Sequence, residues 1–575
     1  MSAPATFDPV LAEVIGHELA AVSEEMAVVT WRTGRSPMLK SGDFATAVCD
    51  AGGQILVRGF AATFQLAVFS DLIVHLSDKY GASIRPGDAF LSNESSHSST
   101  HLPDVVVAMP VFWEGELCAF CAAYSHHSDI GGRFPGGSSS EPTSSFEEGV
   151  VIPAVKVVDR GTVNREMLDL IAANVRASDE WVADLQSKLA GCRRGCAGTT
   201  ALMERFGAPA VRAAGEHLLR RSEAVARAAL QAVPDGSYRA EISVRDDSIR
   251  SPDEILLRLS LTVSGDELSA DLSGCSAQVE GALNMPALMT RAAVYGAVKS
   301  VLAPYEMANS GFFAPLHVHA PPGSIVNPGQ HAAVGGRAAV FFWTYDLVLK
   351  ALAQALPGRV GVPGEATDMM HYAGPDRSGA PGAVVDIYCG GWGGRPDRDG
   401  IDGVAPLWYE VFGTIPVELI ERQYPIVVDG FGFVPDSGGP GRHRGSVGVF
   451  RQWRFLDEGE VMIRNVRLKE EPGFAQGRPG ALPRTTLRCA GELIDLPLRS
   501  TLQQKVHPGD VLLHATAGAG GHGPAFERPV ELVLRDLKSG LVSPAAALAD
   551  YGVALGSAGE VDHQHTQALR KSGRP

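Results

Sequence analysis

The sequence predicts a mixed α+β fold of several layers, in which antiparallel hairpins pack against helices. Apolar residues recur every three or four positions over 9–31 and through much of 164–230, which is the period of an amphipathic helix. Short apolar runs joined by tight turns lie between these segments and are typical of β-hairpins. A chain of 575 residues is too long for one core, so we expect several domains or one large elaborated fold.

Local signals set the order of the elements. Asp8 before Pro9 is a helix start, since the side chain can cap and proline suits the first helical turn. Gly81 is typical of a helix end. In order, we expect a helix over 9–31, strands over 44–50 and 54–60, a helix over 64–81, a hairpin within 100–132, helices through 164–230, strands over 255–263 and 266–274, helices near 287–303 and 340–356, a short helix over 544–551, and a disordered polar tail.

The pattern changes from helical to strand-like at VPDGSYRAE, residues 233–241. We therefore expect three regions. Residues 1–232 form an N-terminal region with the candidate metal site, residues 233–530 mix strands and helices with glycine-rich loops, and residues 531–575 form a short helix and a polar tail.

Charge and hydropathy exclude several classes of function. The net charge of −15 argues against a nucleic-acid-binding protein. The N-terminus lacks the basic and apolar regions of a secretory signal. The longest apolar segments are interrupted by charges before they reach the roughly 18 residues that a membrane span needs. We expect a cytoplasmic protein that does not bind a membrane.

The segment THLPDVVVAMPVFWEGELCAFCAAYSHHSDIGG, residues 100–132, predicts a hairpin with a polar open end. A turn at Glu114-Gly115 places Trp113 opposite Glu116, so Asp104 is expected opposite Ser125. This register brings several metal-binding types of side chain to one end of the hairpin, namely His101, Asp104, His126, His127 and Asp129.

Two interpretations of this end follow from the residues. Histidines with a carboxylate suit Zn, Mn or Fe(II) and leave positions open for water or substrate. The alternative is a hydrogen-bonded polar loop with ordinary histidines. The following loop GGRFPGGSSSEPTSS, residues 131–145, is interpreted as an active-site loop because it is rich in glycine and serine between structured segments.

Several strings occur together in a fixed order along the chain: DFATAVCDAGGQ, THLPDV, HHSDIGG, GALNMPALMTRAAVY, PDSGGPGRHRG and AGAGGHGP. They resemble the hydantoinase B/oxoprolinase family, over about residues 8 to 552. The resemblance implies a divalent metal, Mn or Zn, held by His101, Asp104 and His126 with Asp43 as a further ligand. It also implies that His127 and Asp129 support the ligands, and we expect one of these two to manage the proton.

The resemblance implies a partner as well. In this family a larger, ATP-binding hydantoinase A-like subunit phosphorylates the substrate, and the assembly is a heterotetramer or larger. No lysine of this chain follows a glycine, so the phosphate-binding motif GxxxxGK[ST] does not occur in it.

The implied activity is that of the metal-bearing subunit of an ATP-dependent hydrolase of cyclic amides, such as hydantoin, oxoproline or a lactam. A metal-bound hydroxide would attack the carbon whose oxygen the partner has phosphorylated. Two alternatives remain: a subunit of an ATP-dependent ketone carboxylase, and a binding subunit without catalysis.

Two departures from the family pattern concern the substrate pocket. The segment NESSHSSTH keeps Asn93 but has Glu94 in place of aspartate, and it introduces His97. Arg337 stands where relatives have asparagine, which adds a fixed positive charge. We expect these four residues to line the pocket and to influence which substrate is used. If it faces the pocket, Arg337 should bind a carboxylate, a phosphorylated intermediate or Glu94 itself. The alternative is that Arg337 caps the helix before Phe341 or points to solvent.

Overall fold

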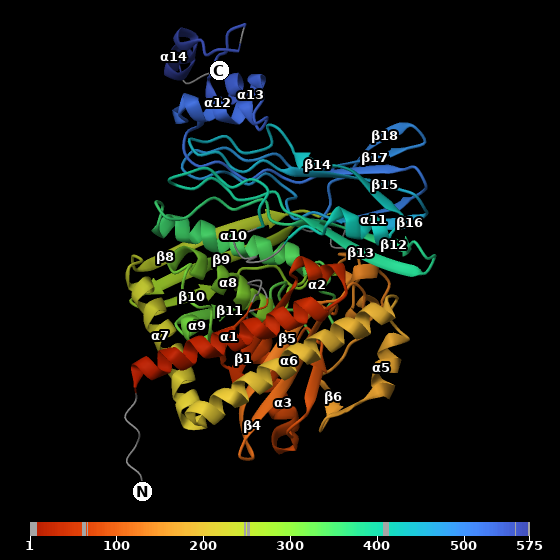
Figure 1. Ribbon diagram of the computed structural model, residues 1–575. Helices are drawn as coiled ribbons and strands as arrows, with labels where there is room; N and C mark the ends of the chain where they lie inside the picture. Colours follow the sequence, from red (N-terminus) through yellow and green to blue (C-terminus); the bar gives the residue numbers. More distant parts are fainter. Residues whose placement is uncertain are drawn as a thin grey trace.

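A seven-stranded antiparallel sheet organises the N-terminal half of the chain in the computed structural model (Figure 1). The structure describes residues 8–572 except 60–64, 66, 247, 248, 250–253, 406–412 and 558. The strand order is β2-β1-β5-β4-β3-β6-β7. The strands are β1 (Phe44–Asp50), β2 (Ile55–Arg58), β3 (Ala89–Ser92), β4 (Asp104–Trp113), β5 (Glu116–His126), β6 (Val155–Asp159) and β7 (Thr162–Val163).

Both faces of this sheet are buried. Side chains alternate between the faces of a strand, so Val105 and Val107 of β4 face one core while Val106 and Ala108 face another. The first core is covered by the three long helices α1 (Pro9–Thr33), α6 (Ser178–Phe206) and α7 (Ala208–Gln231). The second core is covered by α3 (Val68–Tyr80) and α8 (Ala287–Leu302).

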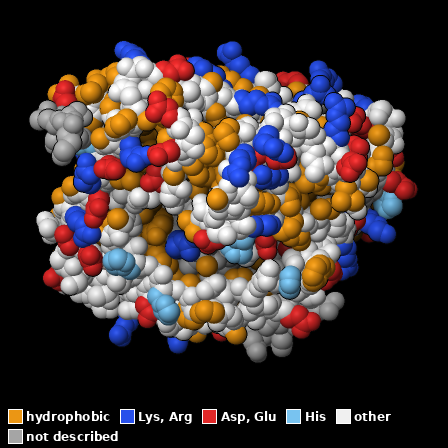
Figure 2. Space-filling model, turned by 90° about the horizontal axis from the view of Figure 1, so that it is seen from below, with side chains coloured by type: hydrophobic (Ala, Val, Ile, Leu, Met, Phe, Trp, Pro, Cys, Tyr) orange, Lys and Arg blue, Asp and Glu red, His pale blue; other side chains and the backbone are white. Residues whose placement is uncertain are grey.

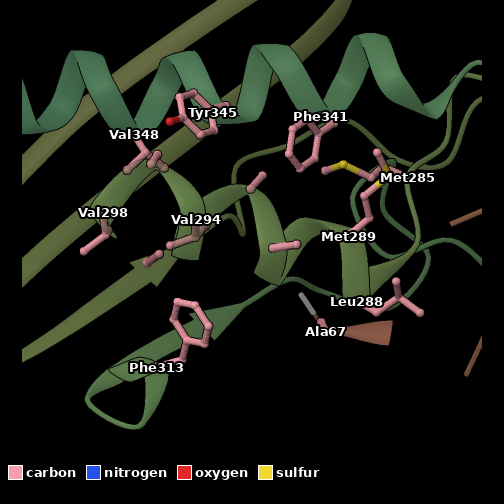
Figure 3. Close-up of a cluster of buried hydrophobic side chains, with 14 of the residues drawn as sticks. Ala67, Met285, Leu288, Met289, Val294, Val298, Phe313, Phe341, Tyr345 and Val348 are labelled. Atoms are coloured by element: carbon pink, nitrogen blue, oxygen red, sulfur yellow. The ribbon is translucent and has the colours of Figure 1, made fainter. Parts of the chain in front are cut away.

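The core that contains α8 extends into the middle of the chain. It includes residues on both sides of residue 232, from β1 to α10 (Arg337–Ala355) and the second sheet. Figure 3 shows Met285, Met289 and Phe341 between α8 and α10. The order of the second sheet is β11-β10-β9-β8, built from β8 (Gly236–Val244), β9 (Ile255–Ser264), β10 (Glu267–Asp271) and β11 (Leu316–His319).

Two further sheets form the C-terminal half, above α10 in Figure 1. The sheet β13-β12-β16-β19 consists of β12 (Asp368–Pro375), β13 (Pro381–Tyr388), β16 (Gly459–Arg464) and β19 (Thr501–Val506). The sheet β14-β15-β20-β17-β18 consists of β14 (Ile426–Phe433), β15 (Val449–Phe455), β17 (Arg484–Cys489), β18 (Glu492–Leu496) and β20 (Val511–Ala515). Apolar side chains such as Tyr388 and Trp453 fill the core between them.

The remaining helices are short. They are α2 (Pro37–Ser41), α4 (Ser145–Glu148), α5 (Arg165–Ala172), α9 (Ser310–Phe313), α11 (Val417–Gln423), α12 (Val530–Lys538), α13 (Pro544–Tyr551), α14 (His563–Ser572) and the 3-10 turns η2 (Gly81–Ser83), η3 (Pro135–Gly137) and η4 (Ala525–Glu527).

The α+β class and the hairpins that the sequence predicts are confirmed. Asp8 caps α1 as expected, since its carboxylate accepts hydrogen bonds from the backbone of Val10 and Leu11. The expectation of a disordered polar tail is wrong for His563–Ser572, because these residues form α14. The side chain of Asp562 accepts a hydrogen bond from the backbone N–H of His565 at the start of this helix. Residue 60 of the strand expected over 54–60 and residues 64 and 66 of the helix expected over 64–81 lie outside the described residues.

The surface is mixed in character. Seen from below, Lys and Arg side chains are interspersed with Asp and Glu among apolar patches (Figure 2). The acidic excess of the chain is therefore not concentrated on this face. Within the described ranges, no helix is long and apolar enough to cross a lipid bilayer.

Candidate metal centre

The β4–β5 hairpin contains a bulge that changes its register. Trp113 pairs with Glu116 at the turn, as predicted, but Val111 pairs with Ala119 and leaves Cys118 as an extra residue. A bulge inserts one residue into one strand and shifts every later pair. Asp104 consequently lies opposite His126, so the predicted pairing with Ser125 is wrong. The shift places Asp104, at the start of β4, directly beside His126 at the end of β5.

His101, Asp104 and His126 come together at this end of the hairpin. Each offers one ligand atom, and these atoms lie within 4.8 Å of one another. Nε2 of His101 is 3.1 Å from Oδ1 of Asp104, and the two imidazole centroids are 4.9 Å apart. All three side chains are buried. In the part of the chain that the structure describes, this is the group that could hold a metal ion.

The ligand atoms have unused hydrogen-bonding capacity. Among the described residues, Nε2 of His101, Oδ1 of Asp104 and Nδ1 of His126 are buried without a hydrogen-bond partner. Leaving such atoms unpaired is costly, so native structures usually give them a partner or an ion. Two imidazoles and a carboxylate are the donors of many Zn, Mn and Fe(II) sites. These three residues therefore fit a divalent cation.

Neighbouring groups fix how the ligands point. Nδ1 of His101 lies 3.1 Å from the carbonyl oxygen of Gly137. A carbonyl only accepts, so Nδ1 carries the proton and Nε2 keeps a free lone pair. The Ser99 hydroxyl lies 2.8 Å from the backbone carbonyl of Asp104 and also contacts that of His101, so its single hydrogen is shared between the two oxygens. The serine-rich segment and the loop 131–145 thus both support the cluster.

Arg337 binds the other oxygen of Asp104. Its Nη2 lies 3.2 Å from Oδ2 of Asp104, and its Nε and Nη2 donate to the Thr100 hydroxyl over 3.0 and 2.8 Å. The Thr100 hydroxyl in turn donates to Oδ2. The guanidinium is buried. Arg337 therefore binds Asp104 and not Glu94, and its expected influence on which substrate is used stays a prediction.

Burial and charge set the protonation of the cluster. Burial and the charge of Arg337 lower the pKa of His101 to about 4. Burial, together with His101, lowers the pKa of His126 well below its usual value. Burial alone would raise the pKa of Asp104, but His101 and Arg337 bring it far below the usual range. At neutral pH the site therefore presents two neutral imidazoles and one carboxylate, which is the ligand form.

Asp43 lies beside the cluster without belonging to the group of three. It precedes β1, and its backbone carbonyl accepts a hydrogen bond from the N–H of His126 over 3.2 Å. Its Oδ1 accepts from Nε2 of Gln65 over 3.1 Å. Burial and the charge of Asp104 raise the pKa of Asp43 to about 8. A bound cation would favour its ionised form and so make it available as a further ligand.

A cavity adjoins the cluster, with an empty volume of about 420 Å³ that is partly open to solvent. Its polar wall carries Asp43, His101, His126, Ser138, Arg337 and Arg464. Its apolar wall carries Met38, Met289, Ala338, Phe341, Phe342 and Met369. The lining residues come from the N-terminal region up to residue 138, from α8 and α10, and from the sheet of β12 and β16.

His127 and Asp129 lie near the cluster in sequence but are bound to other groups. Nε2 of His127 is 2.5 Å from Nζ of Lys188 in α6, on the opposite side of the sheet. Asp129 forms an ion pair with Arg176, whose Nη1 is 2.7 Å from Oδ1. The structure does not bring either side chain to the cavity wall. Their expected part in proton transfer stays a prediction.

Of the four residues predicted to line the pocket, Arg337 does so, whereas Asn93, Glu94 and His97 lie away from the cavity wall. The amide of Asn93 is hydrogen-bonded to the backbone of Leu102, Val150 and Ile152. It therefore holds in place the loop before β4 that carries His101. Oε1 of Glu94 accepts from Nε2 of Gln330 over 3.2 Å. The ring of His97 packs on that of His75, with centroids 4.3 Å apart.

Sequence reasoning missed the contributions of distant segments. Arg464 and Met369 reach the cavity from strands of the C-terminal half. Nothing local in an apolar strand such as DMMHYAGP indicates that one of its faces covers a site more than 200 residues away. Thr100, which links Arg337 to Asp104, was also missed, although its position directly before His101 could have pointed to it.

Comparison with known proteins identifies the family of the chain and proteins with a similar fold. The model of the family described as hydantoinase B/oxoprolinase matches residues 8–525. A protein of Pseudomonas sp. (strain NS671), named as the putative B subunit of a D-/L-hydantoinase, is 30% identical over 98% of this chain and 98% of that protein. The beta subunit of the caprolactamase of Pseudomonas jessenii is 27% identical, over 98% and 99%. The crystal structure of the ATP-dependent caprolactamase from Pseudomonas jessenii matches with a TM-score of 0.90 at 25% identity, over 98% of this chain and 100% of that one.

Proposed function

Because the chain belongs to the hydantoinase B/oxoprolinase family, we propose that it is the metal-bearing subunit of an ATP-dependent hydrolase of cyclic amides. The observation that carries the proposal is the cluster of His101, Asp104 and His126, whose ligand atoms converge without hydrogen-bond partners among the described residues. Two relatives are named for hydantoin and caprolactam, which are both cyclic amides.

Each residue of the site has a distinct part in this proposal. His101, Asp104 and His126 would hold the cation, and Asp43 would join them once a cation favours its ionised form. A divalent cation supplies Lewis acidity, which polarises a carbonyl and lowers the pKa of water. Arg337 keeps Asp104 ionised and oriented.

The apolar wall provides for the substrate ring. Met289, Phe341 and Met369 offer a dry surface beside the charged cluster. A small cyclic amide presents the matching combination, with an apolar ring and one polar amide edge. The ring would lie on the methionine and phenylalanine side chains, and its amide would face the cluster.

A second type of chain is part of the proposal. Relatives are named as the B and beta subunits of their enzymes, and this sequence lacks the GxxxxGK[ST] phosphate loop. We infer that a larger, ATP-binding subunit phosphorylates the amide oxygen and that hydrolysis is completed at the cluster. Mn or Zn is the expected metal.

The test is an assay of this chain co-purified with its large partner subunit. Hydantoin, 5-oxoproline and caprolactam are each supplied with ATP, and ring-opened product and ADP are measured with and without bicarbonate. We expect ring opening that needs ATP and is indifferent to bicarbonate. Stoichiometric consumption of bicarbonate would identify a carboxylase instead. Failure of the complex to open any ring, with metal bound, would overturn the proposal.

A further inference from the structure

His371 is a buried histidine with two unsatisfied ring nitrogens among the described residues. It belongs to β12 and is 3% exposed. Among the residues that the structure describes, neither Nδ1 nor Nε2 has a hydrogen-bond partner. His514 offers a contrast, since it is equally buried but its two nitrogens meet Thr485 and Asp368 over 2.8 and 3.1 Å. Two unsatisfied polar atoms in one buried ring are costly unless they serve a ligand.

The ring lies on the face of the sheet that covers the metal cluster. Alternation along β12 places His371 on the same face as Met369, while Met370 and Tyr372 face the core of the C-terminal half. Met369 lines the cavity, and so does Arg464, which pairs with Met369 across β12 and β16. His371 is the next side chain on this side of the strand, and it lines a smaller neighbouring cavity rather than the one at the cluster.

The loop around η3 connects this ring with the ligands. The carbonyl of Gly137 binds His101, and Ser138 lines the cavity. At Gly136 a Cβ atom would come within 2.5 Å of Nδ1 of His371. A smaller cavity, with an empty volume of about 260 Å³, adjoins the ring between Phe134 and Gln503.

Burial and the charges around His371 favour a neutral ring. Burial lowers its pKa well below the usual value, and Arg464, His126 and His101 lower it further. Arg464 belongs to β16, His126 to the end of β5, and His101 to the loop before β4. Glu460, a carboxylate of β16, lines the smaller cavity.

We propose that His371 transfers a proton at this site, an inference that rests on the proposed function. As the oxygen of a water molecule bonds to the amide carbon, the proton that the water loses passes to His371. When the carbon–nitrogen bond breaks, its electron pair remains on nitrogen, and nitrogen takes this proton. The nitrogen leaves as an amine, and His371 returns to its neutral form. The hydroxyl oxygen becomes the carbonyl oxygen of an acyl phosphate as its proton passes to the amine, and a second water molecule then releases the acid and inorganic phosphate.

The experiment uses the co-purified complex with His371→Ala, and His514→Ala as a matched buried control. General acid–base catalysis typically contributes 10²–10⁴-fold, so kcat for His371→Ala should fall by about 100-fold or more while KM changes little. Added imidazole, which can occupy the space left by the ring, should restore kcat at least tenfold. Elemental analysis should find the metal content of the parent. In His514→Ala, imidazole should restore nothing.

The outcomes separate two failures. If the parent complex opens no ring of hydantoin, 5-oxoproline or caprolactam, the proposed function fails and the inference with it. If the parent is active and His371→Ala keeps its kcat, or loses it without rescue by imidazole, the inference alone is overturned. Loss of metal from His371→Ala would make the residue a ligand instead, which also overturns it.

Discussion

Arg337 binds one oxygen of the Asp104 carboxylate, and the other oxygen lies beside Nε2 of His101. Nη2 of Arg337 lies 3.2 Å from Oδ2 of Asp104, and Nε2 of His101 lies 3.1 Å from Oδ1. The guanidinium compensates the charge of Asp104 and leaves Oδ1 directed at the imidazoles. The carboxylate is therefore ionised and oriented before any cation arrives.

Arg337→Met should destabilise the metal-free chain and increase its response to metal. Removing one partner of a buried ion pair costs about 3–5 kcal/mol, because Asp104 stays buried without compensation. A divalent cation then takes over that compensation, so MnCl2 should raise Tm more in the variant than in the parent. Thermal unfolding after chelation, with and without MnCl2, measures both effects. Equal metal-induced shifts would contradict this reasoning.

A surface arginine is the control for that experiment. Arg484 pairs with Asp495 over 2.8 Å, but both side chains are about two-thirds exposed. Exposed pairs contribute at most about 1 kcal/mol. Arg484→Met should therefore change neither Tm nor its response to MnCl2 by much.

Gly136→Ala should disturb the loop that orients His101. The residue has a φ of 73°, and its new Cβ would come within 2.5 Å of His371. Displacement of the neighbouring Gly137 carbonyl should weaken Mn²⁺ binding roughly tenfold, as loss of an outer hydrogen bond to a ligand does. Titration of the chelated chain with Mn²⁺ measures the affinity.

Gly115→Ala separates backbone strain from contact. Gly115 lies in the β4–β5 turn with a φ of 87° and has nothing within 4 Å of an added Cβ. It should lower stability by about 1 kcal/mol through the left-handed conformation alone. If Gly115→Ala lost as much Mn²⁺ affinity as Gly136→Ala, the loss could not be assigned to the loop at Gly136 that orients His101.

Lys188→Met should change how stability depends on pH. Burial lowers the pKa of Lys188 from its usual 10.5 to about 7, although Ser125 and His127 contact its Nζ. Between pH 7 and 10.5 the unfolded chain holds a proton that the folded chain lacks, so the lysine makes stability rise with pH. The Tm of the variant minus that of the parent should therefore become more positive as pH falls from about 10 to about 7.

Thermal scans at about pH 7 and about pH 9.5 check this prediction. Lys538→Met, on the exposed end of α12, controls for the loss of a lysine as such. A difference between Lys188→Met and parent that is the same at both values would show that Lys188 is not the group responsible.

The fold class and the convergence of the candidate ligands His101, Asp104 and His126 could be predicted because their signals are local. Periodicity marked the long helices, and the two-residue turn at Glu114-Gly115 joined the strands that carry Asp104 and His126. The bulge at Cys118 left no mark in the sequence, and it alone moved Asp104 from Ser125 to His126. A one-residue slip exchanges the faces of a strand, so register was the least predictable part of the site.

The surroundings of the cluster depend on contacts between distant segments. Arg337 was recognised as unusual, but its partner Asp104 lies 233 residues away. His371 and Arg464 belong to the sheet β13-β12-β16-β19 of the C-terminal half, and Arg464 of that sheet reaches the cavity at the cluster. His127 was expected beside its neighbour His126, but alternation along the strand turns it toward Lys188 on the other face.

Metal content tests the central claim most directly. The purified chain, its His101→Ala and His126→Ala variants and the control His97→Ala are loaded with MnCl2 or ZnCl2, freed of excess ion and submitted to elemental analysis. His97 is the control because its ring packs on His75 and lies outside the group of three. We predict about one divalent ion per chain in the parent and in His97→Ala, and loss of nearly all of it in the two cluster variants. Parent-like occupancy in folded His101→Ala and His126→Ala would contradict the account.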